Sequence, residues 1–439
     1  MDKLVIEGGI PLSGSIPIGG AKNAALPILI STLTCGGTHH FRNVPQLVDI
    51  ESTLSLLGRI GCPSRVEATG DFGLGVELDT SRIAFSEAPY NLVRKMRASV
   101  LVLGPLLARC GQATVALPGG CAIGVRPIDQ HLMGLEALGC VFKLENGNIE
   151  GRVKHLKGAE INLSVPTVTG TENILMAAVL ADGVSVIHNA AREPEIVDLV
   201  RFLRSMGARI KGEGTSTLEI DGVPALRPAR EAFSILGDRI EAGTYLLAAL
   251  ITGGNITITG APVADMSSLL QHLRQVGAEI ETGDDWIRLT SPEKGVPVSI
   301  ETAPHPGFPT DMQAQWMAAM SLLSGSCIIS EKVFENRFMH VAELGRMGAN
   351  IRIQGPSAHV SGVDSLTGAT VMATDLRASA SLILAGLAAK GQTEVLRIYH
   401  LDRGYEKLVK KIKMLGGAIA RVSTHSTLPV GSLRQELGN

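Results

Sequence analysis

Apolar residues recur along this chain in a unit of about 70 residues. The unit is clearest at its end, where an amphipathic helical pattern stops at a glycine and alternating apolar and polar residues follow. Successive copies of this glycine are separated by 78, 68, 70, 71 and 68 residues, at Gly61, Gly139, Gly207, Gly277, Gly348 and Gly416. The pattern predicts six copies of one repeat that ends with a helix, a glycine and a strand.

Each repeat also contains an earlier helical segment whose residues are apolar nearly all round, which predicts a buried helix. A glycine-containing turn and a β-rich segment follow each of them. These segments cover residues 24–33, 98–109, 173–181, 242–251, 313–323 and 378–389. Because the unit is longer than the usual solenoid repeats of roughly 20 to 50 residues, we expect globular domains with three repeats each.

Proline and charged residues interrupt the pattern between the third and fourth copies, over residues 227–238. This stretch predicts a boundary between two domains. The pattern is lost again after about Val422, so residues 423–439 are predicted to form a polar tail.

The composition narrows the class of protein. The formal net charge is -2, which gives no electrostatic signature of binding to nucleic acid or to an anionic membrane. Apolar runs stay below the ~20 residues that span a bilayer, and residues 1–7 do not resemble a signal peptide. We therefore expect a cytoplasmic protein without nucleic-acid or membrane partners.

The six cysteines are far apart in the sequence and have no clustered histidines, which predicts neither a metal site nor disulfides. Cys121 differs from the others because it lies in the segment Pro118–Pro127, rich in glycine, with Arg126 close by. A nearby cation lowers the pKa of a thiol from its usual ~8.5, so Cys121 is predicted to be reactive. Buried, inert thiols are predicted for the cysteines Cys35, Cys110, Cys140 and Cys327.

Basic residues at the starts of the apolar helices are candidates for binding an anion, because their hydrogen bonds to it are charge-assisted. Lys22 follows a glycine pair at a helix start, where backbone N–H groups also favour anions. Arg97 and Arg377 begin helices in two Arg-Ala-Ser segments, and Arg403 is expected to open another helix. Each is equally consistent with an ordinary charged residue at a helix start.

Two aspartates precede buried helices and are candidates for a general base. They are Asp311 and Asp375, and a carboxylate that stabilises a helix N-terminus explains either position equally well. No Gly-x-Ser-x-Gly segment is present, and the eleven histidines show no spacing that favours a triad.

Several segments together resemble one family, the UDP-N-acetylglucosamine 1-carboxyvinyltransferases, which are enolpyruvyl transferases. The resemblance covers residues 1–422 and is carried by residues 19–27, 96–99, 118–131, 189–195, 308–315, 334–340, 373–381 and 397–406. It implies an α/β fold of two inside-out barrel domains, each of three repeats with buried helices and outer sheets. The domains would hold residues 22–236 and residues 1–21 plus 237–422, and the substrates would bind in the cleft between them.

The resemblance also implies an activity. The family transfers the enolpyruvyl group of phosphoenolpyruvate to the 3-hydroxyl of UDP-N-acetylglucosamine and releases phosphate through a tetrahedral intermediate, in the first committed step of peptidoglycan synthesis. No cofactor or metal is implied. Cys121 corresponds to the residue that the inhibitor fosfomycin modifies covalently in this family.

Residue roles carry over by position in the matching segments. Asp311 corresponds to the base that deprotonates the sugar hydroxyl, while Cys121 and Asp375 are implicated in proton transfer at C3. The cations for phosphoenolpyruvate would be Lys22, Arg126 and Arg403, with Arg97, Arg337 and Arg377 as further contacts to the anionic substrates. Asn23 would hold the sugar, and the nucleotide would contact Arg126, Pro127, Ile128, Asp129, Gln130 and Val333.

One segment departs from the family pattern. Residues 166–171 read Pro-Thr-Val-Thr-Gly-Thr, where many members read Ser-Val-Gly-Ala-Thr. The phosphate contacts implied for Thr167, Val168 and Thr169 would then come from their hydroxyl and backbone N–H groups.

Three other functions differ in what they require. Enolpyruvyl transfer to shikimate 3-phosphate uses the same reaction, but that family lacks the cysteine segment. A catalytically silent binder of nucleotide sugars would not need Lys22, Cys121, Asp311 and Arg403 together. A cysteine hydrolase would need a histidine partner for Cys121, which no spacing indicates.

Substitution of Cys121 by aspartate tests its predicted reactivity. We expect Cys121→Asp to keep measurable turnover and to lose time-dependent inactivation by fosfomycin, because a carboxylate moves protons but opens epoxides poorly. Residual activity after timed incubation with the epoxide measures this, and inactivation of the variant at the wild-type rate would contradict the assignment.

Overall fold

The structure is a computed structural model, and it describes residues 2–93, 96–117 and 128–423. Three of the candidate residues, Cys121, Arg126 and Pro127, lie outside the described residues. Contacts between Cα atoms divide the chain into two compact units. One contains the described residues from Gly20 to Leu236, and the other contains those up to Gly19 and from Gly237 onward.

The strands of the described residues form six four-stranded sheets, one for each predicted repeat. In every sheet the first two strands are parallel and the remaining pairs are antiparallel. In the unit from Gly20 to Leu236 the sheets are β14(Phe233–Ser234)-β3(Thr38–Val44)-β5(Leu74–Asp79)-β4(Ser64–Ala68), β6(Glu87–Ala88)-β7(Gln112–Ala116)-β9(Asn148–Arg152)-β8(Val141–Glu145) and β10(Glu160–Asn162)-β11(Val184–His188)-β13(Thr217–Asp221)-β12(Arg209–Lys211).

The other unit repeats this sheet pattern three times. Its sheets are β2(Ser13–Pro17)-β15(Asn255–Thr259)-β17(Trp286–Thr290)-β16(Glu279–Thr282), β18(Ile300–Glu301)-β19(Ser326–Ser330)-β21(Ser357–Ser361)-β20(Asn350–Gln354) and β22(Thr370–Met372)-β23(Gln392–Leu396)-β1(Asp2–Glu7)-β24(Ala418–Ser423). Strands β1 and β2, from the start of the chain, therefore complete two sheets built from its second half. Strand β14 likewise completes the sheet that begins with β3, so distant segments close both units.

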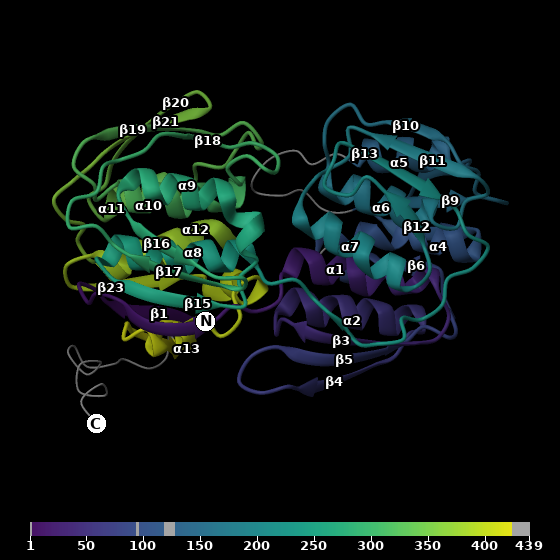
Figure 1. Cartoon of the computed structure of the whole chain (residues 1–439), viewed down its shortest axis with the longest axis horizontal. Helices are drawn as coiled ribbons and strands as arrows, with labels where there is room; N and C mark the ends of the chain where they lie inside the picture. The colour runs from purple at the N-terminus through teal and green to yellow at the C-terminus, as the bar shows by residue number, and fades with distance from the viewer. Residues whose placement is uncertain (1, 94–95, 118–127, 424–439) are drawn as a thin grey trace. The chain divides into compact units, whose positions relative to one another are not determined.

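The apolar helices lie inside these sheets, as predicted, and each is buried along nearly its whole length. In one unit α8, α10 and α12 pack against one another, and each also contacts the strands of its own repeat. In Figure 1 these three helices lie between the strands β18 to β21 above them and the strands β1, β15 and β23 below them. The inner helices are α1(Lys22–Ser31), α4(Leu103–Cys110), α6(Val168–Ala178), α8(Arg239–Thr252), α10(Gln313–Met320) and α12(Leu376–Ala388).

The second helix of each repeat is amphipathic and ends at the predicted glycine. All six glycines have positive φ, between 81° and 108°, which a residue with a side chain adopts only with strain. The helices are α2(Val48–Ile60), α5(Asp129–Ala137), α7(Pro194–Ser205), α9(Ser267–Val276), α11(His340–Arg346) and α13(Leu408–Met414). The predicted six-repeat α/β fold is thus confirmed.

One inner helix differs from its prediction. Residues 98–109 were expected to form a single helix, but the segment begins as the 3-10 helix η2(Arg97–Val102) and continues as α4. Pro105 explains the change, because it has no N–H to donate and its ring would clash with the carbonyl of Leu101 in an α-helix. The other short elements are α3(Tyr90–Val93), η1(Thr32–Thr34), η3(Val263–Met266), η4(Thr310–Met312) and η5(Ile398–Arg403).

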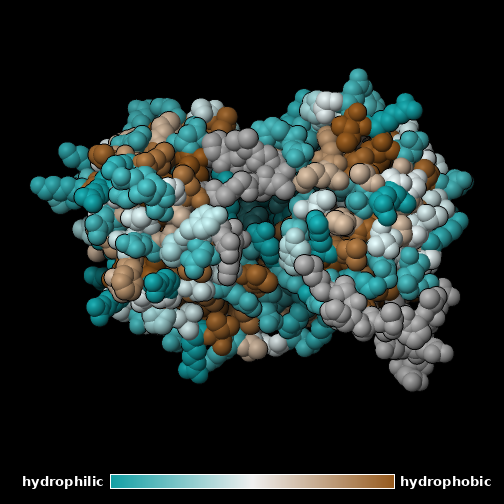
Figure 2. Space-filling view, turned by 180° about the vertical axis from the view of Figure 1, so that it is seen from behind, coloured by the Kyte–Doolittle hydropathy of each residue, from teal (hydrophilic) through white to brown (hydrophobic). Residues whose placement is uncertain are grey.

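Each unit has its own hydrophobic core, built mainly from Leu, Ile, Val, Ala and Met. On the face drawn in Figure 2, apolar residues form patches that hydrophilic residues separate. Among the described residues, no helix combines the length and the apolar character needed to cross a membrane.

Close contact between α4 and α6 makes Gly104 a test of the inner packing. A Cβ at Gly104 would lie 2.3 Å from the backbone oxygen of Asn173, so Gly104→Ala should lower the unfolding free energy by about 2 kcal/mol. Gly58→Ala on α2 is the control, because no atom lies within 4 Å of its added Cβ. Urea denaturation should show no loss of stability for that variant. Equal effects of the two substitutions would contradict tight inner packing.

Candidate functional site

Asp311 forms the centre of an ion-pair cluster in the unit that contains α8, α10 and α12. It lies in η4, immediately before α10, and its two carboxylate oxygens bind different arginines. Oδ1 accepts a 2.7 Å hydrogen bond from Arg337 Nη2, and Oδ2 accepts a 2.8 Å bond from Arg377 Nη2. Both arginines are buried, whereas the Asp311 side chain keeps 26% of its surface exposed. The carboxylate is therefore the accessible part of an otherwise buried charge cluster.

A second layer of hydrogen bonds orients Arg377. Its Nη1 donates to the Tyr405 hydroxyl at 3.2 Å, and Gln315 Nε2 donates to the same oxygen at 3.2 Å. The Tyr405 hydroxyl lies 3.0 Å from Thr244 Oγ1, which itself donates to the Ile240 carbonyl. Because Thr244 donates its only hydroxyl proton to the Ile240 carbonyl, the Tyr405 hydroxyl donates to Thr244. The same hydroxyl accepts the hydrogen bonds from Arg377 and Gln315. Tyr405 thereby connects Thr244 of α8, Gln315 of α10 and Arg377 of α12.

Arg337 is held by a matching set of contacts. Its Nη1 donates to Thr310 Oγ1 at 3.0 Å, and the Thr310 hydroxyl donates to Glu331 Oε2 at 2.8 Å. The other oxygen of Glu331 accepts the backbone N–H groups of Val333 and Phe334. The candidate residue Val333 is thus fixed through its backbone, and its side chain is exposed.

The charges around Asp311 determine its protonation. Burial would raise the pKa of Asp311, but the guanidinium groups of Arg377 and Arg337 outweigh burial and hold this pKa well below its usual range. The Asp311 charge in turn helps to raise the pKa of Arg377, against the effect of burial. Asp311 is therefore ionised at neutral pH and strongly bound to its cations.

Asp375 lies at the helix start that the sequence predicts, whereas Arg403 does not. Asp375 caps α12, because its Oδ1 accepts the backbone N–H groups of Arg377 and Ala378 at 2.8 and 3.0 Å. Arg403 was expected to open a helix and instead ends η5, with α13 beginning at Leu408. Asp402, the residue before Arg403, binds Arg421 through both carboxylate oxygens, at 2.7 and 2.8 Å.

The other unit contains the candidates at the starts of α1 and η2. Lys22 is the first residue of α1, as predicted, and its Nζ lies 3.4 Å from Oδ2 of Asp49, which is buried. Asn23 is the next residue of the same helix. Arg97 begins η2, so the helix-start position expected for it is confirmed.

Thr167, Val168 and Thr169 form the start of α6 in the same unit. Thr167 caps the helix by accepting the Gly170 N–H at 3.2 Å, and the first helical residue is Val168. Thr169 Oγ1 lies 3.2 Å from His131 Nε2. His131 Nδ1 in turn lies 3.1 Å from Asn173 Nδ2, so the ring connects α5 to α6. A helix N-terminus of this kind favours a nearby anion, because its backbone N–H groups carry partial positive charge.

Three further nucleotide candidates lie at the start of α5. Ile128 is the residue before the helix, and Asp129 is its first residue. Gln130 Oε1 accepts the Ser164 N–H at 2.9 Å. This bond joins α5 to the segment that leads into α6, and it brings two candidate segments together.

The thiols differ from the prediction at one position. Cys35, Cys140 and Cys327 are buried, and burial raises their pKa values to about 11, about 12 and about 11. Cys110 was also expected to be buried but is exposed, because it is the last residue of α4.

Several polar residues of the Asp311 cluster were not identified as candidates from the sequence. Thr310, Glu331, Gln315, Thr244 and Tyr405 come from segments up to 161 positions apart. Tyr405 follows Arg403 in a matching segment, and this proximity was the signal that could have identified it. In the part of the chain that the structure describes, no group of three or more His, Cys, Asp or Glu residues is arranged to hold a metal.

Comparisons with known proteins identify the family. The sequence profile of EPSP synthase (3-phosphoshikimate 1-carboxyvinyltransferase) matches residues 6–412. A UDP-N-acetylglucosamine 1-carboxyvinyltransferase of Myxococcus xanthus is 55% identical over 423 residues, covering 96% of this chain and 99% of the relative. One of Geobacter metallireducens is 54% identical over 422 residues, covering 96% and 100%. The chain belongs to the UDP-N-acetylglucosamine 1-carboxyvinyltransferases of the EPSP synthase family.

Solved structures agree with this membership. The enolpyruvyl transferase NikO from Streptomyces tendae has a TM-score of 0.86 at 25% identity, over 98% of this chain and 99% of that one. An EPSP synthase from Acinetobacter baumannii shares the fold, with a TM-score of 0.74 at 16% identity over 96% and 100%. The chain is thus an enolpyruvyl transferase.

The ion pairs of Asp311 predict a pH-dependent contribution to stability. Asp311→Asn leaves Arg337 and Arg377 without their countercharge and should lower the unfolding free energy at pH 7 by about 3 kcal/mol. The pKa of Asp311 is lower in the folded protein than in the unfolded chain, where it is about 3.9. The Asp311 carboxylate therefore stabilises the fold fully above that pH, and this contribution is lost as the pH falls toward the folded-state pKa. The stability difference between wild type and variant should therefore shrink below pH 4.

Urea denaturation at pH 7 and pH 3 measures this difference. Asp402→Asn is the control, because Asp402 binds Arg421 at the surface and its loss should cost less than about 1 kcal/mol. A pH-independent difference for Asp311→Asn would show that its ion pairs do not stabilise the fold.

Proposed function

We propose that Asp311 removes the proton from the 3-hydroxyl of UDP-N-acetylglucosamine while that oxygen attacks C2 of phosphoenolpyruvate. The enolpyruvyl group moves to the sugar through a tetrahedral intermediate, and phosphate leaves. The observation that supports this role is an accessible carboxylate held between two buried arginines. A base in this position needs an adjacent cationic environment, because both substrates carry several negative charges.

The low pKa of Asp311 places a condition on this role. A general base works best when its pKa lies near the working pH, and two bound guanidinium groups make Asp311 a weak base. We propose that substrate anions compete for Arg337 and Arg377 and weaken at least one of these ion pairs. The pKa of Asp311 then rises where the substrates bind, which couples proton removal to the presence of both substrates.

The remaining cations are proposed to bind phosphoenolpyruvate. They are Lys22, Arg97, Arg126 and Arg403, and charge-assisted hydrogen bonds to the carboxylate and phosphate are the reason for their residue types. Lys22 at the start of α1 supports this role, because the helix N-terminus also favours an anion. Asn23, next along α1, is proposed to contact the sugar and the intermediate.

The nucleotide is proposed to bind at the starts of α5 and α6. Arg126, Pro127, Ile128, Asp129 and Gln130 would contact the uridine part, together with Val333. Thr167, Val168 and Thr169 would bind the diphosphate through hydroxyl and backbone N–H groups, as the first turn of a helix does. The hydrogen bond between Gln130 and Ser164 supports a shared role for the two segments.

Proton transfer at C3 is assigned to Cys121 and Asp375, and Cys121 is the proposed site of covalent modification by fosfomycin. We also propose that the two compact units are the two three-repeat domains, formed by residues 22–236 and by residues 1–21 plus 237–422. The reaction would serve peptidoglycan synthesis in the cytoplasm. These assignments rest on the family membership and on the matching segments.

Kinetics of an Asp311 variant test the proposed base. Asp311→Asn should lower kcat by about 10³-fold, because general-base catalysis contributes 10²–10⁴-fold, while calorimetry should still detect binding of UDP-N-acetylglucosamine. Release of phosphate from phosphoenolpyruvate measures turnover. Asp402→Asn, a surface carboxylate bound to Arg421, should keep kcat within about twofold.

The same assay separates the other functions. Phosphate release with shikimate 3-phosphate and none with UDP-N-acetylglucosamine would overturn the proposed acceptor. Tight sugar binding without turnover in the wild type would indicate a nucleotide-sugar binder. If Asp311→Asn retained full kcat, a different residue would be the base.

A further inference from the structure

A buried ion pair connects α8 to α13 in the unit that contains Asp311. Lys411 Nζ donates a 2.7 Å hydrogen bond to Glu241 Oε1, and the two side chains expose only 0% and 4% of their surfaces. The other carboxylate oxygen, Oε2, accepts the backbone N–H of Gly19 at 2.8 Å. All of these residues belong to one compact unit. The two helices are thus joined by charges that have no part in the proposed reaction.

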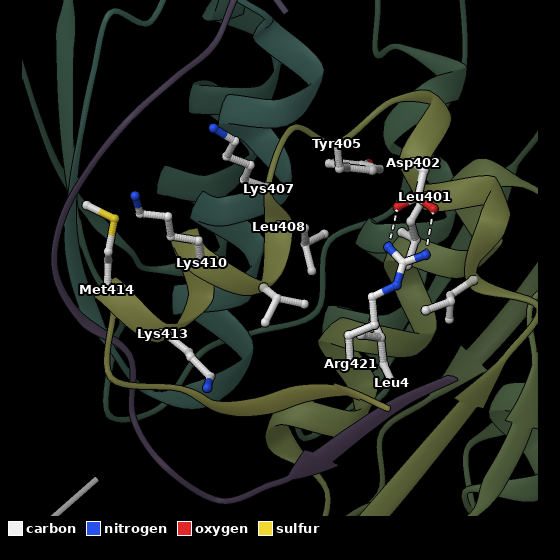
Figure 3. Close-up of a pocket in the computed structure, with 12 residues that line it drawn as sticks. Leu4, Leu401, Asp402, Tyr405, Lys407, Leu408, Lys410, Lys413, Met414 and Arg421 are labelled. Carbon is white, nitrogen blue, oxygen red and sulfur yellow. Dashed lines mark hydrogen bonds and ion pairs between the residues drawn. The ribbon is translucent and has the colours of Figure 1, made fainter. Parts of the chain in front are cut away.

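Lys411 differs from the other lysines in this part of the chain. It lies on the buried face of α13, together with Leu408 and Ile412. Lysine is rarely buried in proteins unless it has a partner of opposite charge. The three exposed lysines of this region line a surface pocket and are labelled in Figure 3, namely Lys407, Lys410 and Lys413. Position 411 therefore places a cation where the helix otherwise buries apolar side chains.

Stability alone does not account for this pair. Moving two charges out of water is costly, and apolar side chains of similar size in place of a buried ion pair often leave stability unchanged or raise it. Burial raises the pKa of Glu241, and the adjacent Lys411 cation offsets only part of this shift. What the pair does fix is which residues of the two helices meet, because any shifted arrangement would leave a buried charge without its partner.

The segment from Tyr405 to Lys411 is attached to α8 at both of its ends. The Tyr405 hydroxyl lies 3.0 Å from Thr244 Oγ1, and Lys411 binds Glu241. Glu241 and Thr244 are three positions apart on α8, a spacing that places side chains on one face of a helix. One face of α8 therefore holds both ends of a seven-residue segment.

Between these two attachments the backbone is strained. Lys407 has a φ of 46°, in the left-handed region that a residue with a Cβ adopts only at a cost. Such a conformation persists where the surrounding structure determines it. The attachments at Tyr405 and Lys411 lie on either side of Lys407 and meet this condition.

We propose that Lys411 is a positioning residue for the charge cluster at Asp311 and that it acts through Tyr405. By holding α13 on α8, the ion pair fixes the place of the Tyr405 hydroxyl, which accepts a 3.2 Å hydrogen bond from Arg377 Nη1. Arg377 in turn binds Asp311 Oδ2. The inference rests on the proposed role of Asp311 as the base, and it adds a buried pair on which the orientation of that base depends.

An apolar replacement of the ion pair tests the proposal. Glu241→Met combined with Lys411→Met removes both charges at similar side-chain length. The variant should therefore fold with a melting temperature at or above that of the wild type. Its kcat/KM for phosphoenolpyruvate should nevertheless fall about tenfold, because small displacements of a reacting group lower the rate. Phosphate release, measured well below the melting temperature, gives this value, and a wild-type kcat/KM would overturn the proposal.

Tyr405→Phe shows whether the pair acts through Tyr405. This variant removes the hydroxyl that contacts Thr244 and Arg377, and it should also lower kcat/KM about tenfold. If both changes act on the same group, the triple variant should lose little more than either parent, because coupled residues are not additive. Losses that multiply to about a hundredfold would overturn the proposal, since the pair would then act independently of Tyr405.

Amide hydrogen exchange of residues 403–411 tests the attachment without reference to the reaction. In the variant with Glu241→Met and Lys411→Met these amides should exchange about tenfold faster, because one attachment to α8 is lost. Lys413→Met is the matched control, since Lys413 is an exposed lysine on the same helix. It should change neither exchange nor kcat/KM. Unchanged exchange in the apolar variant would overturn the attachment, whereas a failure of the base assignment would appear separately, as full kcat in Asp311→Asn.

Discussion

The fold depends on burying helices that are apolar on every side. A helix such as α8 or α10 cannot rest on one sheet with a face in water, because no face is polar. Three such helices packed together still expose outer surfaces, and the inner faces of three sheets cover them. This requirement accounts for the grouping of repeats in threes and for the closure of sheets by strands β1, β2 and β14.

The same arrangement explains how a charge cluster is held with little freedom. In the unit that contains α8, α10 and α12, η4 and the start of α12 bring Asp311 and Arg377 together from positions 66 residues apart in the chain. Tyr405, Gln315 and Thr244 then satisfy the remaining polar groups below them. Because these supports are buried, the Asp311 carboxylate is the part of the cluster most accessible to a change of partners, which agrees with its proposed role as a base.

The sequence by itself determined the repeat, the buried and amphipathic helices and the glycines that end the latter, because these features depend on local periodicity and on positive φ. The matching segments identified Asp311 and Arg377 as candidates. Only the tertiary structure decided that these two share an ion pair and that the Tyr405 hydroxyl binds Arg377. Such contacts join residues far apart in the chain, and local spacing contains no information on which distant side chains meet when helices from separate repeats pack together.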